Sequence, residues 1–77
     1  MDHLLRPLID HLQELPIEEQ DGALNYIITK TLIGLYPKKY FHLNRSLGVL
    51  SAVQEEWYRR HLAPYEDTKI AANGDVE

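Results

Sequence analysis

The chain contains no cysteine, only one tryptophan and one phenylalanine, and no apolar run that approaches 18 residues. Without cysteine, neither a disulfide framework nor a zinc–thiolate centre can stabilise the fold. Without a long apolar run, the sequence predicts no membrane-spanning helix. The N-terminal stretch has early acids and a proline and does not resemble a secretory signal, so we predict a cytoplasmic protein.

The length of 77 residues and the 44% hydrophobic content predict one small helical domain, residues 1–77, rather than a disordered chain. A chain this short buries only about 60% of its unfolded surface, so its core is marginal. Helix packing and self-association are the remaining ways to stabilise it, and we therefore expect a homo-oligomer. The formal charge of −4 argues against binding to nucleic acid or to an anionic membrane.

Apolar residues at helical spacing predict two helices in the first half of the chain. The first covers 5–15, with Pro7 in its first turn, where the missing N–H costs nothing. The second covers 22–36 with Asp21 as its cap, or begins a turn earlier in the acidic stretch 17–20.

A long helix is predicted from about Phe41, with a heptad-like apolar seam along one face. The seam consists of Leu43, Leu47, Leu50 and Trp57, interrupted by Gln54. The opposite side carries two pairs at i,i+4 spacing, Glu55–Arg59 and Glu56–Arg60, which support a solvated helix face.

Pro64 breaks the i→i−4 hydrogen-bond ladder, which predicts a kink. A short helix is predicted after it, with Pro64 in its first turn and Asn73-Gly74 at its end. The predicted fold is all-α: a helical hairpin from the second and third helices, a short N-terminal helix packed across it, and a Pro-kinked C-terminal helical tail. Gly34 and Gly48 lie inside helices, which indicates either close helix contact or tolerance on an exposed face.

The sequence contains no recognisable catalytic or metal-binding motif, and we predict no enzyme activity, no metal and no cofactor. Its four histidines form no i,i+4 pair and no HExxH motif, so we interpret them as surface residues. They are His3, His11, His42 and His61. No serine or threonine lies in a nucleophile motif, and a phosphohydrolase would need a metal.

Polar and aromatic residues gather at two places on otherwise apolar helices. They are Asn25, Tyr26 and Lys30 in the second helix, and Tyr58, Arg59, Arg60, Tyr65, Glu66 and Asp67 around the kink. Arginine offers planar donors to phosphate, tyrosine offers a stacking surface, and such a mixture predicts a pocket for an anionic nucleotide. The alternative is an internal network in which Arg59 or Arg60 pairs with Glu66 or Asp67.

The segments "GALNYIITKTL" and "LNRSLGVLSAVQEEWYRRHLAPYEDTKIAANGDV" resemble a family of short proteins encoded by bacteriophages and prophages. The resemblance covers about residues 22–76 and is most specific in the closing stretch 63–76. The chain departs from the family pattern at Ala23, at Trp57 and at Ser51-Ala52. The matching residues are Asn25, Tyr26, Asn44, Gly48, Tyr58, Arg59, Arg60, Pro64, Tyr65, Glu66, Asp67, Lys69, Asn73, Gly74 and Asp75.

The resemblance implies a phage origin and carries no activity with it. We therefore expect a non-enzymatic phage accessory protein in the host cytoplasm, a small oligomeric binding module that sequesters a nucleotide-like host immune signal. The alternative is a protein–protein interaction module, an adaptor or inhibitor of a host or phage protein. Convergence of the arginines and tyrosines into a concave site would favour the ligand, and a flat exposed array would favour a protein partner.

Overall fold

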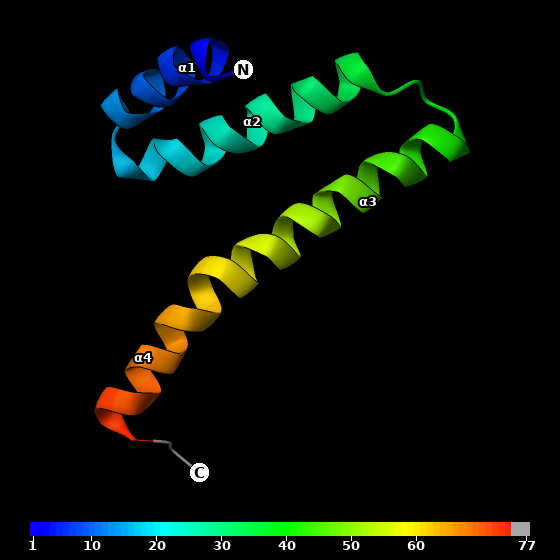
Figure 1. The fold of residues 1–77 in the computed structure, drawn as a ribbon. Helices are drawn as coiled ribbons and strands as arrows, with labels where there is room; N and C mark the ends of the chain where they lie inside the picture. The colour runs from blue at the N-terminus through cyan, green and yellow to red at the C-terminus, as the bar shows by residue number, and fades with distance from the viewer. Residues whose placement is uncertain (75–77) are drawn as a thin grey trace. The chain divides into compact units, whose positions relative to one another are not determined.

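The protein is all-α, and the computed structural model describes residues 1–74. A short N-terminal helix and a second helix precede a long, kinked C-terminal helix (Figure 1). The elements are α1 (Asp2–Glu14), α2 (Ile17–Leu35), α3 (Tyr40–Trp57), the π-helical turn η1 (Tyr58–Leu62) and α4 (Ala63–Asn73). The predicted fold class is confirmed.

The chain divides into two compact units, Met1–Pro37 and a second unit from Lys38 onward. The first unit holds α1 and α2, and the second holds α3, η1 and α4. The predicted hairpin of α2 with α3 would join the two units, and it stays a prediction, as does the single domain.

In the first unit, α1 turns back at Leu15 and contacts α2. The amide of Gln20 donates a hydrogen bond to the Leu15 carbonyl at 3.0 Å, which ties the first turn of α2 to the end of α1. Half-buried residues recur at helical spacing on both helices, as an amphipathic pair requires. They are Leu8, Leu12 and Leu15, and Ala23 and Ile27.

The predicted start of the first helix and the predicted cap of the second need correction. The first helix begins earlier than expected, at Asp2, because the Met1 carbonyl accepts the N–H groups of Leu4 and Leu5 at 3.0 and 3.2 Å. Pro7 therefore lies inside α1 and not in its first turn. Asp21 lies inside α2 and does not cap it.

Pro16 is the N-cap residue of α2. Its ring holds φ at −55°, and its carbonyl accepts the N–H of Glu19 at 2.9 Å, so the acidic stretch 17–20 forms the first turn. This confirms the earlier start that the sequence left open. Glu18 and Glu19 then lie at the N-terminal end of the helix, where the helix dipole favours negative charge.

The second unit is one helical rod in which η1 joins α3 to α4. The N–H of Ala63 donates to the carbonyl of Tyr58, five residues earlier, which is the hydrogen-bond pattern of a π turn. Pro64 lies in the first turn of α4, as predicted, and has no N–H to donate to the carbonyl four residues before it. The wider turn accommodates this missing donor, so the rod kinks without breaking.

The α4 helix ends at Asn73, and Gly74 caps it. Gly74 has φ of +78°, and its N–H donates to the Ile70 carbonyl at 2.7 Å. A left-handed cap of this kind favours glycine, and the predicted stop at Asn73-Gly74 is confirmed. At Gly34 and Gly48, no atom beyond the chain neighbours and the nearby backbone of the same helix lies within 4 Å of an added Cβ.

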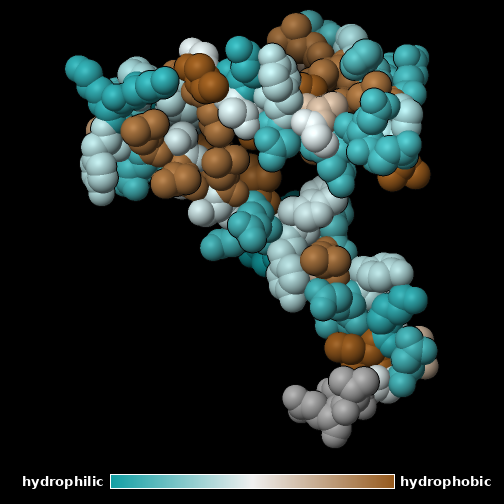
Figure 2. All heavy atoms as spheres, turned by 180° about the vertical axis from the view of Figure 1, so that it is seen from behind, coloured by the Kyte–Doolittle hydropathy of each residue, from teal (hydrophilic) through white to brown (hydrophobic). Residues whose placement is uncertain are grey.

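No apolar side chain is buried in the part of the chain that the structure describes. Among residues 1–74, Ser46 alone is buried, with 8% of its surface exposed. Apolar side chains appear on the molecular surface in Figure 2. In the part of the chain that is described, no helix has both the length and the apolar character needed to cross a membrane.

Candidate functional site

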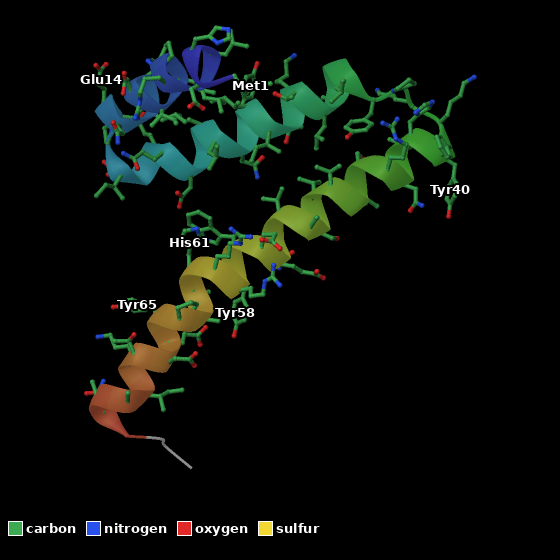
Figure 3. The ribbon with its side chains drawn as sticks, in the orientation of Figure 1. Met1, Glu14, Tyr40, Tyr58, His61 and Tyr65 are labelled. Atoms are coloured by element: carbon green, nitrogen blue, oxygen red, sulfur yellow. The ribbon has the colours of Figure 1, made fainter. Side chains whose placement is uncertain are left out.

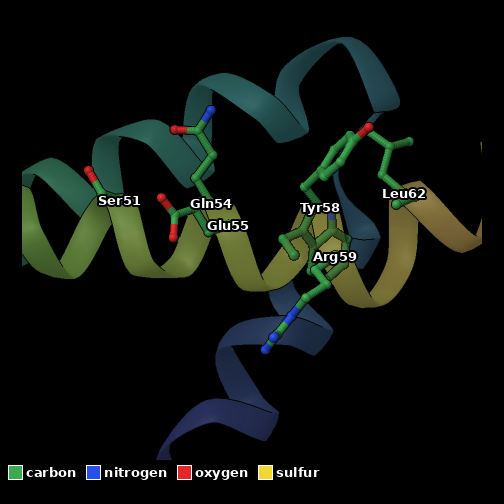
Figure 4. A pocket seen from close by; sticks show the side chains of 8 residues that line it. Ser51, Gln54, Glu55, Tyr58, Arg59 and Leu62 are labelled. Carbon is green, nitrogen blue, oxygen red and sulfur yellow. The ribbon is translucent and has the colours of Figure 1, made fainter.

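A hollow of about 720 Å³ lies along the rod where α3 passes into the π turn. Its lining includes Ser51, Gln54, Tyr58, Arg59 and Leu62 (Figure 4). All of them come from α3 and η1, so this site belongs wholly to the second unit. Its volume falls within the range of about 300–1,000 Å³ that small-molecule sites occupy.

The π turn determines which side chains border the hollow. Tyr58 and Leu62 stand side by side above the turn, whereas Arg59 extends from its other side (Figure 4). Half of the surface of Tyr58 is exposed, so its ring is accessible for stacking. The hollow therefore combines a planar aromatic surface with a cationic group at its edge.

A second, smaller hollow of about 370 Å³ lies beside the first. Its lining includes Val53, Trp57, Arg60 and His61. The rings of Trp57 and His61 lie 4.4 Å apart between centroids and are tilted by 35°, one helical turn from each other. Arg59 and Arg60 thus line two different hollows and do not converge in one.

Both arginines are ion-paired with the same carboxylate, that of Glu56. Arg60 Nε lies 2.8 Å from Glu56 Oε2, and an Arg59 amino group donates to Oε1 of the same side chain. The predicted pair Glu56–Arg60 is confirmed. The predicted pair Glu55–Arg59 is wrong, because Arg59 reaches Glu56 at the i,i+3 spacing.

The alternative network, in which Arg59 or Arg60 pairs with Glu66 or Asp67, is also wrong. Glu56 lies one turn before the arginines on the same helix face and is the nearer partner. Both arginine side chains are 70% exposed, so these pairs are solvated and easily exchanged for another anion.

The α4 residues of the predicted set lie outside both hollows. Tyr65 is 59% exposed, and the ammonium group of Lys69 lies 5.7 Å from the centroid of its ring. Glu66 and Asp67 are exposed in the first turns of α4. Tyr58, His61 and Tyr65 follow one another along the rod in Figure 3. The structure therefore places these residues on an open helix surface.

The remaining predicted residues, Asn25, Tyr26 and Lys30, belong to α2 in the first unit. The Lys30 ammonium lies 6.0 Å from the Tyr26 ring centroid, which confirms that the two side chains share a helix face. The Thr29 hydroxyl donates to the Asn25 side-chain oxygen at 3.4 Å. These residues form a polar cluster on α2, in the first unit.

The described residues can bind anions and planar groups. Across residues 1–74, no group of three or more His, Asp or Glu side chains is placed to hold a metal ion. The chemistry that the π-turn hollow offers is stacking on Tyr58, donation from Arg59 and apolar contact with Leu62.

Sequence reasoning missed the π turn and, with it, the hollow. It placed Tyr58 and Arg59 in the candidate set but not Ser51, Gln54 or Leu62. The sequence does contain a sign of the π turn. After Trp57 the next apolar residue of the seam is Leu62, one residue later than the spacing of an α-helix would place it.

The model of one protein family, described as a domain of unknown function (DUF6899), matches residues 2–76. No curated protein and no solved structure matches the chain. Since the match covers nearly the whole sequence, the chain belongs to this family.

Proposed function

We propose that this member of the DUF6899 family is a non-enzymatic phage accessory protein that acts by binding. It is a small oligomeric module in the host cytoplasm, and it sequesters a nucleotide-like host immune signal. The observation that supports this function best is the π-turn hollow, where Tyr58 and Arg59 border a space of nucleotide size.

A nucleotide would use two features of this hollow. Its base stacks on the exposed ring of Tyr58, and its phosphate accepts hydrogen bonds from Arg59. The phosphate takes the place of Glu56 on the guanidinium group, which is possible because the pair is solvent-exposed. Arg60 is paired with the same carboxylate and lines the neighbouring hollow, where it holds a second phosphate.

The test is isothermal titration calorimetry of the full chain with a panel of cyclic and linear nucleotides. Charge-assisted hydrogen bonds contribute about 1.5–3 kcal/mol, so Arg59→Ala should weaken binding by roughly ten- to a hundredfold. Arg6→Ala is the matched control, because Arg6 forms a similar exposed ion pair with Asp10 at 3.2 Å on α1. It should leave the affinity unchanged.

Two outcomes would refute this function. One is the absence of heat with every nucleotide in the panel at millimolar concentration. The other is an equal loss of affinity in the Arg6→Ala and Arg59→Ala variants, because binding would then respond to net charge and not to the hollow.

A second candidate function is a protein–protein interaction module, and the α4 surface favours it. Tyr65, Glu66 and Asp67 form an exposed array outside both hollows, with Lys69 beside the tyrosine. Such a helix face suits docking to a protein. Tyr65→Ala and Asp67→Ala should then abolish capture of the partner and leave nucleotide binding intact, whereas Arg59→Ala should do the reverse.

A further inference from the structure

The apolar seam of α3 continues through the π turn into α4. Along α3 its residues are spaced by four, three, four and three positions, and after the turn by three, four and three. The step across η1 is five residues instead of four. The members of this rod seam are Leu43, Leu47, Leu50, Gln54, Trp57, Leu62, Tyr65, Lys69 and Ala72.

The π turn explains this five-residue step. A π turn inserts one residue into an α-helix, and each α-helical residue rotates the chain by about 100°. Without η1, Leu62 and Tyr65 would lie about a quarter of a turn away from the line of Leu43, Leu47 and Leu50. With η1, they lie on that line, so one face of the rod carries a mostly apolar line of residues that Gln54 and Lys69 interrupt.

This face is exposed. Leu47 and Trp57 are 62% and 64% exposed, and Leu62 and Tyr65 are 47% and 59% exposed. A single helix cannot bury its own apolar stripe, so the stripe must pack against another element. The rod runs from Tyr40 to Asn73 and is about 51 Å long at 1.5 Å per residue.

The first unit is too short to cover this length. Its longest helix, α2, has 19 residues and extends about 28 Å. In any placement of the two units, about half of the seam stays uncovered by the chain's own helices. One segment of the sequence has both the length and the apolar pattern to cover it, and that segment is the rod of a second copy.

The area of the rod seam also fits pairing with the rod of a second copy. A strip of about one third of the helix circumference over about 51 Å amounts to roughly 600 Å² for each rod. A stable protein interface buries about 800 Å² on each partner, so two paired rods come close to the area that a stable dimer needs.

Charge along the second unit determines the direction of pairing. Residues 38–54 carry three basic residues and no acid, for a net charge of +3. The described residues 61–74 carry two acids and one lysine, for a net charge of −1, and the six residues between the two segments are neutral. Parallel rods would bring like charges together, whereas antiparallel rods place each basic end beside an acidic end.

We propose that the rod seam is the interface of an antiparallel, two-fold symmetric dimer whose axis passes near Trp57. This deepens the oligomer of the proposed function by naming its surface. Leu47 of one copy then packs beside the partner subunit's Tyr65, and Leu50 packs beside the partner subunit's Leu62. Packed helices of this kind lie about 8–10 Å apart.

The first experiment uses the absence of native cysteine, which allows single cysteines to be placed at will. Leu47→Cys and Tyr65→Cys are prepared separately, mixed in denaturant, refolded together and treated with a short bismaleimide. We expect covalent dimers in the mixture and almost none in either variant alone. Crosslinking within each single variant would overturn the antiparallel direction, and no crosslinking in the mixture would overturn the interface.

The second experiment measures mass by sedimentation equilibrium without any nucleotide, so that its result is independent of the ligand. Leu47→Glu should convert dimers to monomers, whereas Ala52→Glu, with the same added charge on the opposite face, should leave the dimer intact. A wild-type chain that stays monomeric at high micromolar concentration would overturn the proposal. It would leave nucleotide binding by the hollow untouched.

Discussion

The shared carboxylate of Glu56 offers a direct test of the binding site. Replacing it by glutamine keeps the size and the helix propensity of the side chain but removes the charge that holds Arg59 and Arg60. We expect Glu56→Gln to bind phosphate-containing anions more tightly than the wild type, because both guanidinium groups lose their resident anion. We also expect its stability to change little.

The size of each effect follows from the geometry. A phosphate on Arg60 would lie about 5 Å from the Glu56 carboxylate, where repulsion between unit charges in water is about 0.8 kcal/mol. Removing the charge of the Glu56 carboxylate therefore strengthens phosphate binding about fourfold. Exposed helix pairs contribute about 0.3–0.5 kcal/mol each, so losing both costs less than about 1 kcal/mol of unfolding free energy.

The assay is calorimetric titration with pyrophosphate, the simplest anion with two linked phosphoryl groups, at low ionic strength. Urea denaturation of the same samples gives the unfolding free energy. The control variant is Asp10→Asn, which removes the same charge from the Arg6–Asp10 pair in α1, at similar exposure. It should leave the pyrophosphate affinity unchanged.

Weaker binding by Glu56→Gln would refute the reasoning, because the carboxylate would then be holding the arginines in their binding position. An equal gain in Asp10→Asn would also refute it, since the effect would come from net charge. A loss of several kcal/mol of stability would show that the Glu56 pairs are structural and not exchangeable.

Three further predictions concern the backbone. Gly48→Ala should raise the unfolding free energy by roughly 1 kcal/mol in urea denaturation, because the added methyl meets open space and alanine favours the helix. Gly74→Ala should lower it by roughly 1 kcal/mol or reduce the far-UV helix signal, because φ of +78° strains any residue with a Cβ. Pro64→Ala restores an N–H and should let η1 relax to α-helix, which would strengthen the helix signal at 222 nm. Leu62 and Tyr65 would then leave the rod seam, so the dimer should weaken in sedimentation equilibrium. A stabilised Gly74→Ala, a destabilised Gly48→Ala or an unchanged dimer in Pro64→Ala would contradict these arguments.

Much of the local structure could be predicted because helix periodicity and terminal residues act over a few positions. The apolar spacing of α3, the first-turn position of Pro64 and the stop at Gly74 all follow from this kind of signal. The start of α1 could not be predicted in the same way, because a proline inside a helix is disfavoured by about 3 kcal/mol. In the structure, α1 contacts α2 and still includes Pro7.

The candidate site, too, could be predicted only in part from the sequence. Residue types alone indicated Tyr58 and Arg59, but the partners of the arginines depended on which carboxylate lay nearest on the folded helix. Asn25, Tyr26 and Lys30 could be assigned to one face of α2 from their spacing. Their placement beside the π-turn residues would require contacts between the two units, which no local pattern encodes.

By itself, then, the sequence determined that this protein is all-α, where most helices end and which residue types could bind an anion. Those features depend on periodicity, on proline and glycine geometry and on side-chain chemistry, which act locally. Only the structure decided that the backbone hydrogen bonds change to the π pattern at Tyr58–Leu62 and that Glu56 holds both arginines. It also decided that a hollow opens beside this turn. A π turn is a rare, single-turn change inside an α-helix, so its position depends on the side chains and backbone groups that surround the turn.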